Sequence, residues 1–213
     1  MVDHDTVQWD TARDELRTAE LALMQQREAV AELRRGLPAG PIAADYTFSN
    51  EAGEVTLDSL VGERPLMVYH FMFGATMAQP CPMCSMWADG WNAVADHINQ
   101  RADFVLATLG TASENAELAA ARGWQNLRWL SAANTTFKQD YGSADADGNQ
   151  WPFISIFERD GSDVRLSYSG SAHISGDHWR GVDLLSPVWH LLDLTRPGRG
   201  DWMPRLSYEA AEA

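Results

Sequence analysis

The pattern of apolar and polar residues from Pro38 onward predicts strands that alternate with helices. Residues 66–73 and 104–109 are continuous apolar runs bounded by turn or polar residues, which is typical of buried central strands. The other predicted elements are β-like pieces within 46–60, helices at 85–100, 113–122 (with Ser113 as its N-cap) and 183–194, a short strand at 127–130, and hairpin strands at 153–158 and 164–168. This order predicts an α/β fold with a central mixed β-sheet flanked by helices.

Residues 5–37 carry a different pattern, which predicts one long helix that ends near Gly36 and Pro38. Its apolar residues recur every seven positions, at Trp9, Leu16, Leu23, Val30 and Leu37. Such a row covers either the domain of its own chain or a second copy, and symmetric dimers are the commonest oligomers. We therefore expect an N-terminal helical extension over residues 1–37, a main domain over 38–213, and a homodimer with the helix at its interface. A helix folded back onto its own domain is the alternative.

Composition and charge restrict the classes of partner. The chain has 213 residues and a formal net charge of −14, with 16 Lys and Arg against 30 Asp and Glu. Lys138 is the only lysine among the basic residues. We expect no nucleic-acid or membrane partner, because each would require a basic face, and no stretch approaches the ~18 consecutive apolar residues of a membrane helix. The polar, acidic first ten residues do not resemble a secretory signal, so we expect a cytoplasmic protein.

The only two cysteines, Cys81 and Cys84, form one Cys-Pro-Met-Cys motif between a predicted strand and a predicted helix. Structural zinc usually takes four protein ligands, and the chain has no second cysteine pair. A helix N-terminus stabilises a thiolate, and Pro82 is tolerated in the first turn. Cys84 lies one turn later on the same face and can reach Cys81. The motif therefore predicts a redox-active disulfide with no other certain cofactor, acting on a small-molecule or protein thiol or disulfide substrate.

A second feature is the pair Trp151-Pro152, directly before a predicted strand. Proline at such a place is unusual unless its peptide bond is cis or it is the first residue of the strand. The spacing from the cysteines is similar to that in thioredoxin-like folds, in which a cis-proline faces the Cys-x-x-Cys loop and helps to hold the substrate. We therefore expect Pro152 to shape a substrate groove beside Trp151, with a trans turn proline as the alternative.

Longer motifs resemble those of a bacterial protein family. They are Asp45-Tyr-x-Phe48, Tyr69-His-Phe-Met-Phe-Gly74, Cys81-Pro-x-Cys-Ser-x-Trp-Ala-Asp89, Arg180-Gly-x-Asp183 and Leu192-Asp-Leu-Thr195 with Gly198-Arg199. From about Trp9 to Asp201, the chain resembles the thioredoxin-like proteins of domain-of-unknown-function family 899, and it departs from them between Ser169 and His178. The resemblance implies a thioredoxin-like fold and a redox site at the cysteines, without implying a substrate. A peroxiredoxin variant is disfavoured, because residues 77–80 supply no threonine two positions before Cys81.

Several side chains near the motif are further candidates for the site. Asp89 is a candidate proton carrier for the cysteines, with a salt-bridged carboxylate as the alternative. Trp87 and Trp151 are candidates for an aromatic substrate pocket, with aromatic core as the alternative. Arg180 is a candidate for binding an anionic group. Together with the cysteines and Pro152, these residues form the predicted oxidoreductase site.

A copper site is the alternative interpretation of the same motif. Cu(I) prefers soft ligands, and several methionines lie near the cysteines in the sequence, namely Met72, Met77, Met83 and Met86. The ligands would be Cys81 and Cys84 with one histidine out of His70, His173 and His178. The protein would then be a copper carrier or a copper-dependent oxidase. Ordinary core packing accounts for the methionines and for His70 equally well.

Overall fold

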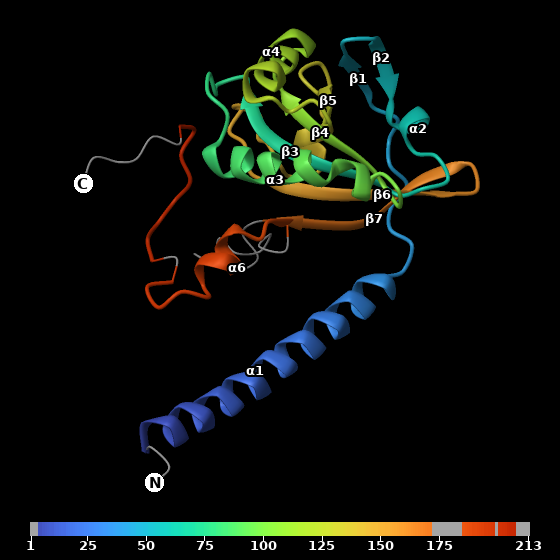
Figure 1. Ribbon diagram of the computed structural model, residues 1–213. Coiled ribbons are helices and arrows are strands. Elements are labelled where there is room, and N and C mark those ends of the chain that lie inside the picture. Colours follow the sequence, from blue (N-terminus) through green and yellow to red (C-terminus); the bar gives the residue numbers. More distant parts are fainter. Residues whose placement is uncertain (1–3, 172–184, 199, 208–213) are drawn as a thin grey trace. The chain divides into compact units, whose positions relative to one another are not determined.

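Figure 1 shows the computed structural model, which describes residues 4–171, 185–198 and 200–207. The chain divides into two compact units, Met1–Pro38 and Ala39–Ala213. The division falls in the proline- and glycine-containing segment that follows the predicted long helix. The sheet and all the shorter helices belong to the second unit.

The second unit is built on a seven-stranded mixed sheet with the strand order β2-β1-β5-β4-β3-β6-β7. Its strands are β1 (Thr47–Asn50), β2 (Gly53–Thr56), β3 (Leu66–Gly74), β4 (Asp103–Leu109), β5 (Arg128–Ser131), β6 (Phe153–Asp160) and β7 (Asp163–Ser171). β3, β4 and β5 are parallel to one another, and the other neighbouring pairs are antiparallel. The two apolar runs form the adjacent strands β3 and β4, which confirms that they are buried central strands.

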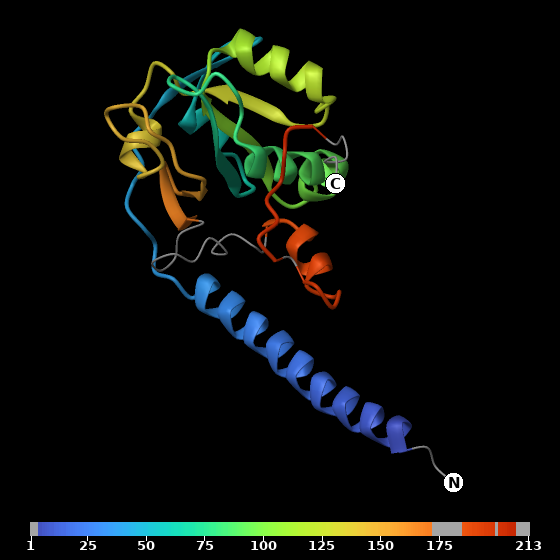
Figure 2. The same cartoon turned by 90° about the vertical axis from the view of Figure 1, so that its left-hand side faces the viewer.

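Helices cover both faces of this sheet, as Figures 1 and 2 show. They are α2 (Leu57–Leu60), α3 (Pro82–Ile98), α4 (Ala112–Arg122), α5 (Phe137–Asp140) and α6 (Val188–Leu192). Tyr69, Phe71 and Phe73 of β3 share one core with α3, whereas Leu66 and Val68 share the other core with α2 and α5. Because side chains alternate along a strand, neighbouring residues of β3 enter opposite layers.

Two helix predictions were wrong in detail. The N-cap of α4 is Thr111 and not Ser113, because Thr111 forms a reciprocal capping box with Glu114, which satisfies two backbone N–H groups. The predicted helix over 183–194 is, in the described part of the chain, only the five-residue α6. Pro187 precedes α6 and lacks an N–H group, so the helix begins after it.

The first unit is the single helix α1 (His4–Arg35), as the heptad pattern predicts. The apolar row is exposed, with Trp9 63%, Leu16 47% and Leu23 52% accessible. A contiguous apolar stripe of this kind is typical of an interaction surface. Among the helices that the structure describes, none is both long and apolar enough to cross a membrane.

Substitution of the apolar row tests the expected homodimer. We expect Leu16→Glu with Leu23→Glu to convert a dimer into a monomer, because charge in a helical seam opposes association. Light scattering after size-exclusion chromatography measures the mass. The matched control is Thr18→Glu with Gln25→Glu, which adds the same charge at exposed positions outside the row. A monomeric full chain, or a dimer that survives the seam substitutions, contradicts the expectation.

Candidate functional site

The carboxyl end of β3 places the cysteine motif. At Gly74 the backbone has φ +78°, and a side chain there would overlap the backbone of Gly110, so this position requires glycine. The chain then turns back on the strand, and the N–H of Cys81 donates to the carbonyl of Met72 at 3.1 Å. The return of the chain fixes Cys81 beside the strand that precedes it.

Cys81 is the N-cap residue of α3 and is half-buried, and Pro82 occupies the first turn as predicted. The pKa of Cys81 is lowered to about 7. The main cause is a hydrogen bond from the Cys84 side chain, and backbone N–H groups of Cys84 and Met83 contribute against the opposing effect of burial. These donors lie where a helix N-terminus presents unpaired N–H groups. At neutral pH, Cys81 is therefore a thiolate in a much larger fraction of molecules than an ordinary cysteine is.

Cys84 differs from Cys81 in both its burial and its pKa. Its side chain is fully buried in the core that α3 shares with β3. Burial raises the pKa of Cys84 well above its ordinary value, and the hydrogen bond to Cys81 and the charge of Cys81 raise it further. The site thus contains one accessible thiolate and one inner thiol that donates to it.

Tyr69 is a site residue that the sequence analysis missed. Its hydroxyl oxygen lies 3.2 Å from the Cys84 sulfur, and the side chain is fully buried. Burial raises the pKa of Tyr69 well above its ordinary value, and Cys84 adds to this, so the phenol keeps its proton. Tyr69 can therefore donate to the Cys84 sulfur while Cys84 donates to Cys81. The signals in the sequence were its place in the apolar strand and in the motif Tyr69-His-Phe-Met-Phe-Gly74.

The structure does not bring His70 together with the cysteines. Its ring is buried in the opposite layer and stacks on Phe137 at a centroid distance of 5.0 Å. Nε2 lies 2.9 Å from the hydroxyl of Ser155, and Nδ1 lies 2.7 Å from that of Ser143. Burial lowers the pKa of His70 well below its ordinary value, so the ring is neutral. His70 is a satisfied core residue, which was the simpler interpretation of its position.

The other predicted metal ligands and the predicted anion-binding residue lie outside the described residues; they are His173, His178 and Arg180. Within the described ranges, no group of three or more His, Cys, Asp or Glu side chains is arranged to hold a metal ion. Met83 is buried in the core beneath the cysteines, and Met72 and Met86 pack against it. The copper interpretation remains a prediction.

Asp89 is salt-bridged and does not belong to the cysteine cluster. Its carboxylate accepts hydrogen bonds from Arg122 Nη2 at 2.9 and 3.2 Å and from Trp124 Nε1 at 2.8 Å. These contacts join α3 to the end of α4 and to the loop that follows it. Its position supports packing between helices rather than proton transfer at the cysteines.

The predicted role of Trp87 in substrate binding is wrong, because its side chain has no exposed surface. The indole lies in the core between Tyr69 and Trp189, at ring-centroid distances of 5.8 and 6.2 Å. Trp151 differs, since 39% of it is accessible. Of the two predicted aromatic contacts, only Trp151 presents a surface that a substrate can touch.

The expectation of a cis-proline at Pro152 is also wrong. The described residues contain no cis peptide bond, so Trp151-Pro152 is trans, and Pro152 is buried just before β6. The last pair of the β3–β6 ladder is His70 with Phe153, and continuing this register by one residue would place Pro152 opposite Phe71. Because proline has no N–H group, the ladder ends there. The carbonyl of Phe71 is left without a strand partner.

Lys138 fills this gap in the ladder. Its side chain is fully buried, and Nζ donates to the carbonyl of Phe71 at 2.8 Å and to Oε1 of Gln150 at 2.7 Å. The amide of Gln150 in turn donates to the carbonyl of Gly74 at 3.2 Å. Burial lowers the pKa of Lys138 to about 7, although the nearby Cys84 raises it. The sequence analysis did not propose Lys138 as a site residue. The signal for it was that Lys138 is the only lysine in a chain whose other basic residues are arginine.

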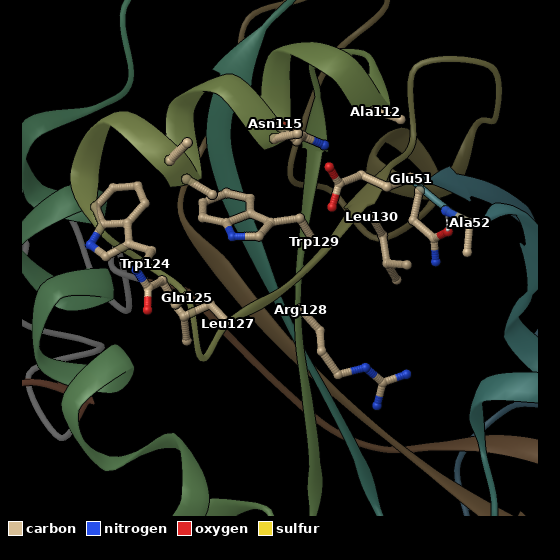
Figure 3. A pocket seen from close by; sticks show the side chains of 14 residues that line it. Glu51, Ala52, Ala112, Asn115, Trp124, Gln125, Leu127, Arg128, Trp129 and Leu130 are labelled. Atoms are coloured by element: carbon tan, nitrogen blue, oxygen red, sulfur yellow. Dashed lines mark hydrogen bonds between the residues drawn. The ribbon is translucent and has the colours of Figure 1, made fainter.

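Figure 3 shows a cavity of about 490 Å³ elsewhere in the same unit, between α4, β5 and the β1–β2 turn. The rings of Trp124 and Trp129 stack there at a centroid distance of 5.5 Å, and the side chain of Asn115 lies beside them. Neither cysteine lines this cavity. Phe71 packs edge-on against both tryptophans, so the cavity borders the core of the site and not its opening.

Comparison with known proteins settles the family. The family model described as "Bacterial protein of unknown function (DUF899)" matches residues 2–210. The chain belongs to this family. None of the curated protein sequences matches it.

Several solved structures share the fold of this DUF899 protein. Peroxidoxin BcpB from Mycobacterium tuberculosis is 18% identical with a TM-score of 0.54, and the match covers 70% of this chain and 94% of that one. A PrxQ mutant from Xylella fastidiosa is 9% identical with a TM-score of 0.52, covering 71% and 95%. A thiol peroxidase from Chromobacterium violaceum is 15% identical with a TM-score of 0.50, covering 74% and 87%. Because peroxiredoxins have a thioredoxin-like fold, the predicted fold class is confirmed.

The pH dependence of alkylation tests the charge of Cys81. We expect the iodoacetamide rate to rise with pH and to reach half its plateau near pH 7, because the pKa of Cys81 is lowered to about 7. At about pH 6 the rate should exceed that of a free cysteine roughly fivefold, after allowance for the lower nucleophilicity of a less basic thiolate. Peptide mass spectrometry assigns the alkylated residue, and Cys84 should react only after unfolding.

Two substitutions of Cys84 serve as matched controls for that measurement. Cys84→Ala removes the hydrogen bond to Cys81 and should move the midpoint toward higher pH. Cys84→Ser keeps a donor and should stay closer to the wild type. A midpoint at the ordinary thiol value in the wild-type protein would refute the assignment.

Replacement of Asp89 separates a packing role from a catalytic one. We expect Asp89→Ala to lower the free energy of unfolding by about 2 kcal/mol, because three hydrogen bonds to a partly buried carboxylate are lost. The midpoint of Cys81 alkylation should not change. Denaturant unfolding gives the stability, and Asp96→Ala at an exposed position of α3 is the control. A shifted alkylation midpoint would restore Asp89 as a proton carrier.

Proposed function

We propose that the protein is a dithiol–disulfide oxidoreductase in which Cys81 is the nucleophile and Cys84 is the resolving thiol. The observation that carries this proposal is the contrast between the two sulfur atoms. Cys81 is half-buried at a helix N-terminus with a lowered pKa, whereas Cys84 is fully buried with a raised pKa. An accessible thiolate attacks well, and an inner thiol one helical turn away can displace what the first has bound.

The reaction consists of two thiol–disulfide exchanges. The Cys81 thiolate attacks one sulfur of a substrate disulfide, which forms a mixed disulfide and releases the other substrate sulfur as a thiolate. Cys84 then loses its proton and attacks the Cys81 sulfur, which forms the Cys81–Cys84 disulfide and releases the second substrate thiolate. Each released thiolate takes up a proton. The substrate gains two electrons, and the protein dithiol loses two.

Tyr69 and the backbone of Met72 support the second exchange. Burial raises the pKa of Cys84, and hydrogen bonds from the Tyr69 side chain and from the Met72 backbone oppose part of this increase. When Cys84 becomes a thiolate, both donors point at the developing charge without having to reorganise. Fixed donors of this kind stabilise charge more effectively than water that must reorient.

A disulfide is a better candidate oxidant than a hydroperoxide, although similar solved structures are named peroxidoxin and thiol peroxidase. Gln79 and Pro80 precede Cys81 and supply no hydroxyl group. The nearest upstream threonine, Thr76, donates its hydroxyl to the carbonyl of Gly148 at 3.1 Å. The segment before Cys81 therefore offers no free hydroxyl to hold a peroxide oxygen.

The proposal is tested by mixing the reduced protein with dithiobis(nitrobenzoic acid), an aromatic disulfide that releases a coloured thiolate in each exchange. We expect two equivalents per chain from the wild type, in a fast and then a slower phase, with loss of two hydrogens from the protein mass. Cys84→Ser should release one equivalent and remain as a mixed disulfide on Cys81. Stopped-flow absorbance and intact-mass spectrometry give both results.

Cys81→Ser is the control, and it should show no fast phase. Hydrogen peroxide is used in parallel at equal concentration. A wild-type protein whose fast phase is no quicker than that of a free cysteine, or one that peroxide oxidises faster than the disulfide does, would contradict the proposed function.

A further inference from the structure

Among the residues that the structure describes, Lys138 is a fully buried ionisable group whose charge interacts with Cys84, and the two exchanges above do not use it. It comes from α5, on the face of the sheet opposite α3, and its ammonium reaches the open edge of β3. No carboxylate among the described residues forms a salt bridge with it. Its charge interacts with Cys84 of α3 and with His70 of β3. Of these two groups, His70 is neutral, so Cys84 is the one that can become a negative partner.

One peptide group connects Lys138 with Cys84. The carbonyl of Phe71 accepts a hydrogen bond from Lys138 Nζ at 2.8 Å, and the backbone of Met72 hydrogen-bonds to the Cys84 sulfur. These two backbone groups belong to the same planar peptide unit, in which the C=O and the N–H point in opposite directions. An ammonium at the oxygen end polarises the unit and strengthens donation at the nitrogen end, because linked hydrogen bonds reinforce one another.

Because Lys138 and Cys84 are both buried, the pair is most stable when its net charge is zero. A lone ammonium or a lone thiolate is costly in the protein interior, whereas a neutral amine with a thiol, or an ammonium with a thiolate, leaves no net charge. Lysine can change between these forms, but arginine stays charged in proteins. This difference accounts for a lysine at this position in a chain whose fifteen other basic residues are arginine.

We propose that Lys138 is a positioning residue for the second exchange, which stabilises the Cys84 thiolate through the Phe71–Met72 peptide group. This role rests on the dithiol function proposed above. In the mixed disulfide, the ammonium form of Lys138 stabilises the thiolate that forms as Cys84 loses its proton, and the thiolate attacks the Cys81 sulfur. The Cys81–Cys84 bond forms as the bond from Cys81 to the substrate breaks. The departing substrate sulfur carries the electron pair away and takes up a proton, which balances the one that Cys84 released.

Two substitutions separate the charge of Lys138 from its hydrogen bonds. Lys138→Met removes both, whereas Lys138→Gln removes the charge and keeps a hydrogen-bond donor on a side chain that is one bond shorter. In the stopped-flow assay, we expect both variants to keep the fast phase of Cys81 and to slow the second phase at least about tenfold. That figure follows because the loss of one pKa unit of stabilisation lowers the thiolate fraction tenfold. Thermal unfolding shows whether each variant remains folded.

A second measurement does not depend on the reaction. Thiolate absorbance in the ultraviolet is titrated in Cys81→Ser, where Cys84 is the only thiol, with and without Lys138→Gln. We expect the midpoint of Cys84 to rise by about one pH unit or more when the lysine is replaced.

The outcomes separate this proposal from the proposed function. An unchanged Cys84 midpoint, a second phase as fast in Lys138→Gln as in the wild type, or loss of both phases in folded variants would overturn the role of Lys138. In those cases a fast phase in the wild type still upholds the dithiol function. The opposite outcome is also distinguishable. If Lys138→Gln raises the Cys84 midpoint but the wild type shows no fast phase, the link between Lys138 and Cys84 is upheld and the oxidoreductase function is refuted.

Discussion

Burial of Cys84 beneath Cys81 is the constraint on which the rest of the site depends. Because Cys84 is fully buried, it is a poor acid and keeps its proton, and its S–H group donates a hydrogen bond to Cys81. The outer sulfur becomes the thiolate as a result. Tyr69 and the backbone of Met72 complete the surroundings of the inner sulfur. Two chemically identical side chains thus acquire different acidities through burial and through the hydrogen bonds around them.

The carboxyl end of β3 provides most of the groups that create this difference. Gly74 allows the strand to approach the backbone of Gly110 and turn, and the carbonyl of Met72 accepts a hydrogen bond from the N–H of Cys81. Where the ladder ends at Pro152, the carbonyl of Phe71 has no strand partner and accepts a hydrogen bond from Lys138 instead. A regular strand would have used all its backbone groups in the sheet. The early end of the β3–β6 ladder is therefore what gives a side chain from the opposite face access to the site.

The relation to solved structures extends to the fold and not to the chemistry of the site. Sequence identities of 9 to 18% accompany a thioredoxin-like arrangement over about 70% of the chain. A fold of this kind hosts more than one reaction, so the function must be argued from local residues. Here those residues are the cysteine pair at a helix N-terminus, the tyrosine beneath it and the buried lysine. The match to the DUF899 family model, over residues 2–210, includes all of them.

The sequence by itself determined the central strands, because a continuous apolar run must be covered on both faces. It also determined that the dithiol lies at the start of a helix, because the proline after the first cysteine is favourable in a first helical turn. Only the tertiary structure decided that Tyr69 and not His70 faces the dithiol, since periodicity separates the two faces of a strand without saying which helix covers each. It also decided that Pro152 is trans, that Asp89 pairs with a distant arginine, and that Lys138 reaches the sheet edge. Each of these outcomes depends on contacts between residues far apart in the chain, which local pattern does not encode.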